Sequence, residues 1–104
     1  MFVSLTRVNT ADQPIENAPI IAEEMLGWLQ EIEGFEGLVL LSRPGTTLGL
    51  AFWESEEVAE RHSVARQQFV ERVMAVADVT LEERVGYEVT FAHVGPLMKD
   101  STTP

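Results

Sequence analysis

Residues 34–61 of the chain read GFEGLVLLSRPGTTLGLAFWESEEVAER. An unbroken apolar run at 38–41 is followed by Pro44 and Gly45, which have the chemistry of a tight turn, and then by a second apolar run at 48–53. This pattern predicts a β-hairpin. Ser55 is a natural helix N-cap, and Glu56 and Glu57 place negative charge where a helix dipole favours it. The stretch therefore predicts two paired strands followed directly by a helix.

The residues before this stretch predict one strand and one helix. Residues 2–8 are rich in strand formers, and polar breakers at 9–14 end the strand. Pro19 fits only the first turn of a helix and Asn17 can act as N-cap, so a helix is expected to start within 16–18 and to stop at Gly34. Its apolar stripe is Ile21, Met25, Trp28, Leu29 and Ile32.

The residues after the stretch predict one continuous second helix and a last strand. Residues 79–82 look like a connector, and residues 84–94 alternate strictly between two faces, which is typical of a strand. Residues 95–104 have little to bury and are expected to form a tail beyond a domain at 1–94. The apolar stripe of the second helix is Val58, His62, Ala65, Phe69, Val73 and Val76.

The predicted order of elements is β, α, β, β, α, β, the ferredoxin-like α+β arrangement, in which two helices cover one face of a four-stranded antiparallel sheet. The strand at 38–41 is apolar on both of its faces, which is the pattern of a sheet buried on both sides. The face without helices therefore needs a cover. A second copy of the chain is the simplest one, so we expect a homodimer formed through the sheet face.

Composition narrows the classes of partner. The chain has 104 residues, enough for one domain with one modest core. Its 17 acidic and 7 basic side chains give a net charge of -10, which argues against nucleic acid and membrane partners. The lack of cysteine excludes disulfides and thiolate metal sites. With no signal peptide or membrane span either, we expect a soluble protein of the cytoplasm.

The element Gly34, Phe35, Glu36, Gly37, followed by the hairpin and by FWESEE at 52–57, resembles the antibiotic biosynthesis monooxygenase superfamily of dimeric α/β barrels. The likeness covers residues 1 to about 94, and the stress-responsive and muconolactone-isomerase-like families of the same barrel remain open. The resemblance implies a small homodimer whose ligand sits between sheet and helices. It also implies an oxygenase without metal or flavin, in which a deprotonated polyphenol itself reduces dioxygen.

The chain departs from the superfamily at several positions. The quinone-forming branch resembles it at Trp53, but the Asn and the Tyr of that branch correspond to Gly49 and Ala59 here, and a basic residue of its second helix corresponds uncertainly to Arg72. The haem-degrading branch needs a Trp in the second helix, which is absent, and a His near the end of that helix. These differences argue against haem degradation. They also leave open the alternative that the protein is a non-catalytic homodimer, which either binds a small ligand or has a structural role.

Four residues are candidates for a site. His62 interrupts an apolar stripe and could take a phenolic proton, and Trp53 could stack on an aromatic ligand, so we predict these two as catalytic. Arg66 could steady an anion and Phe69 could line a cleft, so we predict them as substrate-binding. The alternatives are a hydrogen-bonded histidine at the core edge, a core tryptophan and a solvated arginine.

No cofactor or metal is expected. Two distant histidines without cysteine or an Asp-rich loop give no metal-ligand spacing, and no phosphate-binding loop is present. Without such groups, redox chemistry at this chain would depend on the electrons of the substrate, which asks the protein only for a base and a dry pocket. His93, near the chain end, could contact either a ligand or a second copy of the chain.

Overall fold

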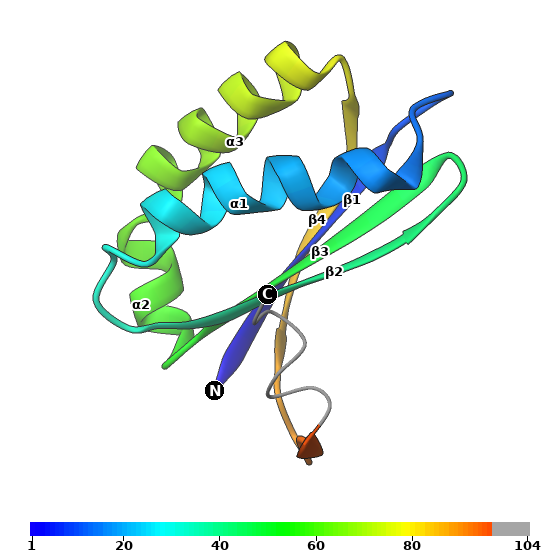
Figure 1. Ribbon diagram of the computed structural model, residues 1–104. Helices are drawn as coiled ribbons and strands as arrows, with labels where there is room; N and C mark the ends of the chain where they lie inside the picture. The colour runs from blue at the N-terminus through cyan, green and yellow to red at the C-terminus, as the bar shows by residue number, and fades with distance from the viewer. Residues whose placement is uncertain (97–104) are drawn as a thin grey trace.

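The computed structural model describes residues 1–96, so the predicted tail at 95–104 lies almost entirely outside the described residues. Four strands form one antiparallel sheet in the order β2-β3-β1-β4, and the helices follow the predicted alternation (Figure 1). The elements are β1 (Phe2–Asn9), the short 3-10 helix η1 (Ile15–Asn17), α1 (Ala18–Leu29), β2 (Phe35–Arg43), β3 (Thr46–Trp53), α2 (Glu56–Arg61), α3 (Ser63–Ala77) and β4 (Thr80–Glu88).

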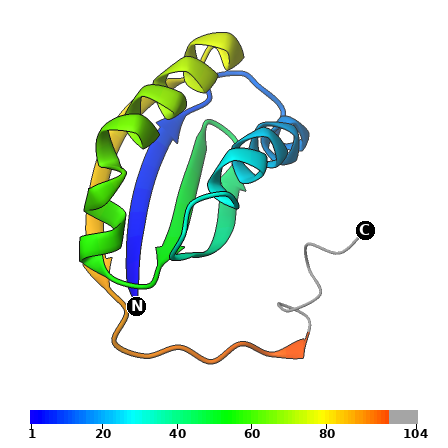
Figure 2. The same ribbon diagram turned by 90° about the vertical axis from the view of Figure 1, so that its left-hand side faces the viewer.

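The helices lie on one face of the sheet. Helix α1 contacts β2, α3 contacts β4, and the two helices also contact each other. Figure 2 shows α1 and α3 spread over opposite margins of the same face, with β1 and β3 between them. The predicted ferredoxin-like α+β fold is therefore confirmed.

Strand register decides which side chains meet under the helices. Phe2 pairs with Trp53 on β3, and Thr6 pairs with Gly49 on one side and with Arg84 on the other. Alternate side chains of a strand point to opposite faces, so these residues share the helix-covered face. The other face, which we call the open face, carries apolar side chains from all four strands: Val3, Leu5, Val39, Leu41, Leu48, Leu50, Phe52, Val85 and Tyr87.

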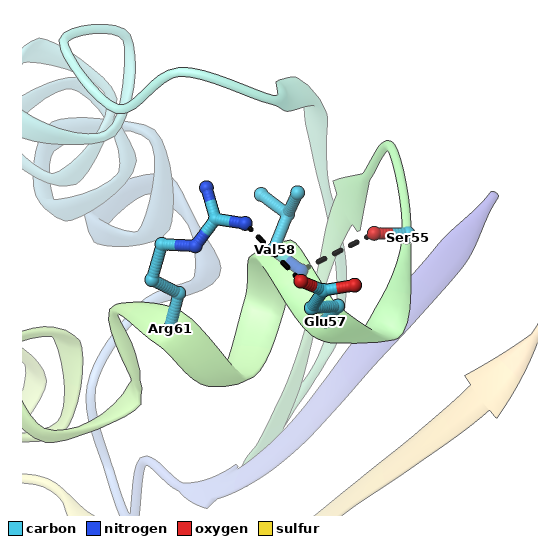
Figure 3. Close-up of polar contacts among 4 residues, drawn as sticks. All are labelled: Ser55, Glu57, Val58 and Arg61. Carbon is cyan, nitrogen blue, oxygen red and sulfur yellow. Dashed lines mark hydrogen bonds and ion pairs between the residues drawn. The ribbon is translucent and has the colours of Figure 1, made fainter.

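The tightest part of the core lies where β3 passes into α2. Leu29, Trp53 and Ala59 are buried there, with Trp53 fully shielded from solvent. The start of α2 is fixed as predicted, because the Ser55 Oγ accepts a hydrogen bond from the Val58 N–H at 3.2 Å (Figure 3). One turn on, Arg61 and Glu57 form an exposed pair at 3.5 Å. The Ser55 cap therefore starts α2 at Glu56, only two residues after Glu54 and close to the buried Trp53.

The predicted single second helix is wrong, because it divides at His62. The backbone of His62 has φ -110° and ψ 14°, outside the α region, and α3 begins at Ser63. The break changes which side chains face inward. Ala65 and Val76, expected on the buried stripe, are exposed, whereas Arg66 and Val70 turn toward the sheet. Because α2 packs on the core and α3 packs on β4, the side chains of the two helices do not follow the single 3.6-residue period that was predicted.

Two predicted boundaries also differ, whereas α1 begins at Ala18, within the predicted 16–18. Helix α1 ends at Leu29, before Gly34, in tight turns such as the Ile32 N–H to Leu29 carbonyl bond. Asn17 makes no side-chain cap, because η1 already supplies the turn that precedes α1. Residues 80–82 belong to β4 and are not a connector.

Strand β4 also stops at Glu88, not at residue 94. Glu88 pairs with Phe2, the first residue of β1, so β1 offers no strand partner to the residues after Glu88. One more backbone hydrogen bond among the described residues follows, from the Val89 N–H to the Met1 carbonyl. Without a neighbouring strand, the residues that follow leave the sheet, as the orange segment of Figure 2 shows. Phe91, placed in the strand by its alternation, is consequently 87% exposed.

Replacing Gly34 by alanine should lower the free energy of unfolding by about 1–3 kcal/mol. Gly34 has φ +93°, and a Cβ there would lie 2.5 Å from the Val58 Cγ1. Urea denaturation measures the change. Gly27→Ala is the matched control, since Gly27 is exposed within α1 and a Cβ there meets nothing within 4 Å. The control should gain about 0.5–1 kcal/mol. Equal stability of Gly34→Ala and wild type would contradict the expectation.

Candidate functional site

A cavity lies between the helix layer and the sheet. Its walls come from all four strands and from α1 and α3, and they are mainly apolar. The centre of a water-sized molecule can occupy about 100 Å³ of it, whereas one water needs roughly 10–15 Å³ by this measure. The Gln13 side-chain amide donates to the Ala77 carbonyl, which ties the loop before α1 to the end of α3 beside the cavity. The space is therefore large enough for a small organic molecule.

Aromatic side chains form part of the helical wall. Trp28 of α1 and Phe69 of α3 stack with ring centroids 4.8 Å apart and planes 13° from parallel. Both residues line the cavity. The predicted binding residue Phe69 is thus on the cavity wall, where flat rings give a suitable contact surface for an aromatic ligand.

Arg66 is the charged group of the helical wall. Its guanidinium carbon lies 4.7 Å from the ring centroid of Trp53, a cation–π contact. Its Nη1 is buried and has no hydrogen-bond acceptor among the described residues. Burial, and secondarily the positive charge of Arg84, lowers the pKa of the Arg66 guanidinium. Arg66 is half-buried and lines the cavity, so it is not the solvated helix charge of the alternative interpretation.

Trp53 lies behind this arginine. It is the last residue of β3, it is fully buried, and it contacts Phe35 edge-on at 5.5 Å. Its Nε1 has no acceptor among the described residues. Trp53 is not among the residues that line the cavity, so it supports Arg66 from beneath.

The structure does not bring His62 to the cavity. The residue is half-buried at the break between α2 and α3, and it is not part of the cavity lining. His93 is exposed and also lies outside the lining. Arg72 is exposed on α3. Of the four predicted site residues, Arg66 and Phe69 therefore lie on the cavity wall, Trp53 adjoins Arg66, and His62 stands apart.

Two residues of the cavity were not singled out from the sequence. Trp28 appeared only as a member of an apolar stripe, and its ring pairing with Phe69 depends on how α1 and α3 meet. Arg84 lines the cavity from β4. Its strand alternation places it on the same face as Gly86, but only the pairing with Thr6 shows that this face looks toward the helices.

No group of three or more His, Cys, Asp or Glu residues within 1–96 could hold a metal ion. Across that part of the chain, no helix combines the length and the apolar character needed to cross a membrane.

Comparison with known proteins identifies the fold. The sequence matches no family model and no curated protein. Among solved structures, SnoaB, a cofactor-independent oxygenase from Streptomyces nogalater, superposes with a TM-score of 0.66 at 15% identity, over 88% of this chain and 94% of that one. The ActVA-Orf6 monooxygenase of Streptomyces coelicolor, solved with the ligand nanaomycin D, gives 0.62 at 20% identity, over 90% and 91%.

A third structure, of a Deinococcus radiodurans protein assigned to the antibiotic biosynthesis monooxygenases, gives a TM-score of 0.60 at 20% identity, over 90% of this chain and 97% of that one. These likenesses extend over nearly the whole described chain, and at such identities they speak to fold. The chain has the fold of the antibiotic biosynthesis monooxygenases, as its resemblance to them predicted.

Proposed function

We propose that this protein is a homodimeric monooxygenase that oxidises a small, electron-rich aromatic compound in the cavity between sheet and helices. The observation that carries the proposal is the cavity itself, whose wall holds the half-buried Arg66 together with the stacked rings of Trp28 and Phe69. Structures with this fold include a cofactor-independent oxygenase and a monooxygenase solved with nanaomycin D. Fold alone does not fix activity, so the proposal depends on the cavity.

In the proposed reaction the ring of the substrate stacks on Trp28 and Phe69, and Arg66 stabilises its deprotonated oxygen. An arginine in a poorly solvated site favours an anion strongly, which shifts a phenol toward the electron-rich form that can reduce dioxygen. One oxygen atom then enters the product and the other leaves as water, with the substrate supplying all the electrons. Trp53 holds the guanidinium in place from below.

The role of His62 as the base stays a prediction. Because its imidazole is not part of the cavity lining, a proton would reach it only through water or through a rearrangement at the α2–α3 break. Loss of a general base typically costs roughly 10²- to 10⁴-fold in rate. Oxygen consumption by His62→Ala with dihydroxy-aromatic substrates decides the point, and unchanged turnover would remove His62 from the mechanism.

The proposed dimer buries the open face. None of the described helices covers that face, and Leu41 and Tyr87 on it are half-exposed. A continuous apolar sheet surface is unusual on a monomer and marks an interaction site. A second copy of the chain would cover it, and a location in the cytoplasm likewise stays a prediction.

A non-catalytic ligand-binding dimer is the second candidate. Gly49, which stands where the quinone-forming branch has Asn, lines the cavity and offers no polar group there. Ala59, at the Tyr position of that branch, is buried in the core and does not line the cavity. Binding of an aromatic compound without oxygen uptake would favour this candidate.

Filling the cavity should lower turnover without unfolding the protein. Gly49 lies on the cavity floor, and a Cβ there would meet the Leu40 Cδ2 at an ordinary 3.5 Å. We expect Gly49→Ala to retain activity and Gly49→Leu to lose about tenfold or more, since its side chain takes space from the ligand. Oxygen consumption with a panel of dihydroxy-aromatic substrates measures this.

Thermal unfolding is the control, because both Gly49 variants should melt cooperatively. Full turnover by a folded Gly49→Leu would place the reaction outside this cavity. If the wild type took up no oxygen with any substrate of the panel, the proposed monooxygenase activity would be contradicted. The non-catalytic ligand-binding dimer would then be the remaining candidate.

A further inference from the structure

We infer that the ligand of this cavity is an aromatic carboxylic acid, whose carboxylate is bound jointly by Arg66 of α3 and Arg84 of β4. The inference depends on the proposed function only in that an aromatic molecule occupies the cavity. It adds the chemical class of that molecule, a flat ring that bears a carboxylate in addition to any phenolic group.

The charged residues of the cavity walls are positive, whereas the net charge of the protein is negative. The chain carries 17 acidic and only 7 basic residues, yet the lining contains two arginines and no Asp, Glu or His. Arg66 and Arg84 are also the only half-buried arginines among residues 1–96; the other four, Arg7, Arg43, Arg61 and Arg72, are exposed. An acidic protein thus keeps two positive charges in its apolar cavity.

Neither of these arginines forms an ion pair within residues 1–96. The ion pairs of the described chain join Arg7 to Glu83, Arg61 to Glu57 and the N-terminus to Glu88. Arg66 instead faces the ring of Trp53 and leaves its Nη1 without an acceptor. Both residues line the same cavity, and the positive charge of Arg84 contributes, second to burial, to the lowered pKa of Arg66. An anion bound in the cavity would offset the unfavourable interaction between these two positive charges.

The arrangement suits a carboxylate in addition to a phenolate oxygen, because two guanidinium groups offer more N–H donors than a single oxygen can accept. The two arginines come from opposite walls, Arg66 from the helix layer and Arg84 from the sheet, where it pairs with Thr6. A carboxylate has two oxygens, each of which can accept from a different guanidinium group, and such charge-assisted hydrogen bonds are stronger than neutral ones. The Trp28 and Phe69 pair would then hold the ring to which the acid is attached.

The test compares three probes that share one ring system: 2-naphthoate, the neutral 2-naphthamide and 2-naphthyl phosphate. Isothermal titration calorimetry on the purified wild type measures each affinity at one fixed salt concentration. We expect 2-naphthoate to bind at least about tenfold more tightly than 2-naphthamide. In Arg66→Met and in Arg84→Met this preference should fall by about tenfold, while the affinity for 2-naphthamide stays within about twofold.

Arg72→Met is the matched control, because Arg72 lies exposed on the same helix as Arg66 and should leave every affinity unchanged. Equal affinities for 2-naphthoate and 2-naphthamide would overturn the inference that the ligand is an acid, while leaving the aromatic site of the proposed function intact. Tighter binding of 2-naphthyl phosphate than of 2-naphthoate would overturn the inference that the anionic group is a carboxylate and would favour a phosphate ester. Binding of none of the probes would overturn both the inference and the aromatic site.

Discussion

Leu50→Asp is expected to convert the protein from a dimer to a monomer. Leu50 lies on the open face in the middle of the sheet, paired with Leu5 on β1 and with Val39 on β2. In a dimer formed through this face, an aspartate would be buried among apolar side chains without a partner. An unpaired buried charge costs about 3–5 kcal/mol, so the dissociation constant should rise by at least about 100-fold. Sedimentation equilibrium at micromolar protein measures the shift.

The matched control places the same charge on the helical side of the molecule. Val76 of α3 is as apolar as Leu50 but 87% exposed, so Val76→Asp should leave the dimer unchanged. Circular dichroism confirms that both variants are folded. A wild type that is monomeric at these concentrations, or a folded Leu50→Asp that stays dimeric, would contradict an interface on the open face.

The sheet was predictable because its determinants are local. Pro44 and Gly45 marked the turn, and Gly45 indeed takes φ +88° between β2 and β3. The apolar runs around that turn identified the hairpin, and the Ser55 cap identified the start of α2. The end of β4 was not predictable in this way, since alternation continues to residue 94 while the partner strand begins at Phe2. A strand can extend only as far as its neighbour allows.

The site was harder to predict because it depends on the break at His62. One continuous helix would place Ala65 on the buried face and leave Arg66 in solvent. No proline or glycine marks the break, and it follows from how α2 and α3 pack on different parts of the sheet. Arg84 was missed for a different reason, since alternation alone does not show which face of β4 looks toward the helices and only the pairing with Thr6 decides it.

Trp53→Ala is expected to lower the free energy of unfolding by about 3–5 kcal/mol, the usual cost of truncating a buried large aromatic residue. Trp53 is fully shielded and packs in one cluster with Leu29 and Ala59. The loss would be a large share of the roughly 5–15 kcal/mol that stabilises a typical domain. Urea denaturation followed by far-ultraviolet circular dichroism measures it.

The matched control for Trp53→Ala is Trp28→Ala, which removes the same side chain from a half-buried position on the cavity wall. Because Trp28 is less buried, its removal should cost less stability than that of Trp53, but it should weaken aromatic binding directly through loss of the stack with Phe69. Trp53→Phe keeps a ring under Arg66 and should recover part of the stability. If Trp53→Ala cost no more than Trp28→Ala, the core would not be centred on Trp53, and its support of Arg66 would lose its basis.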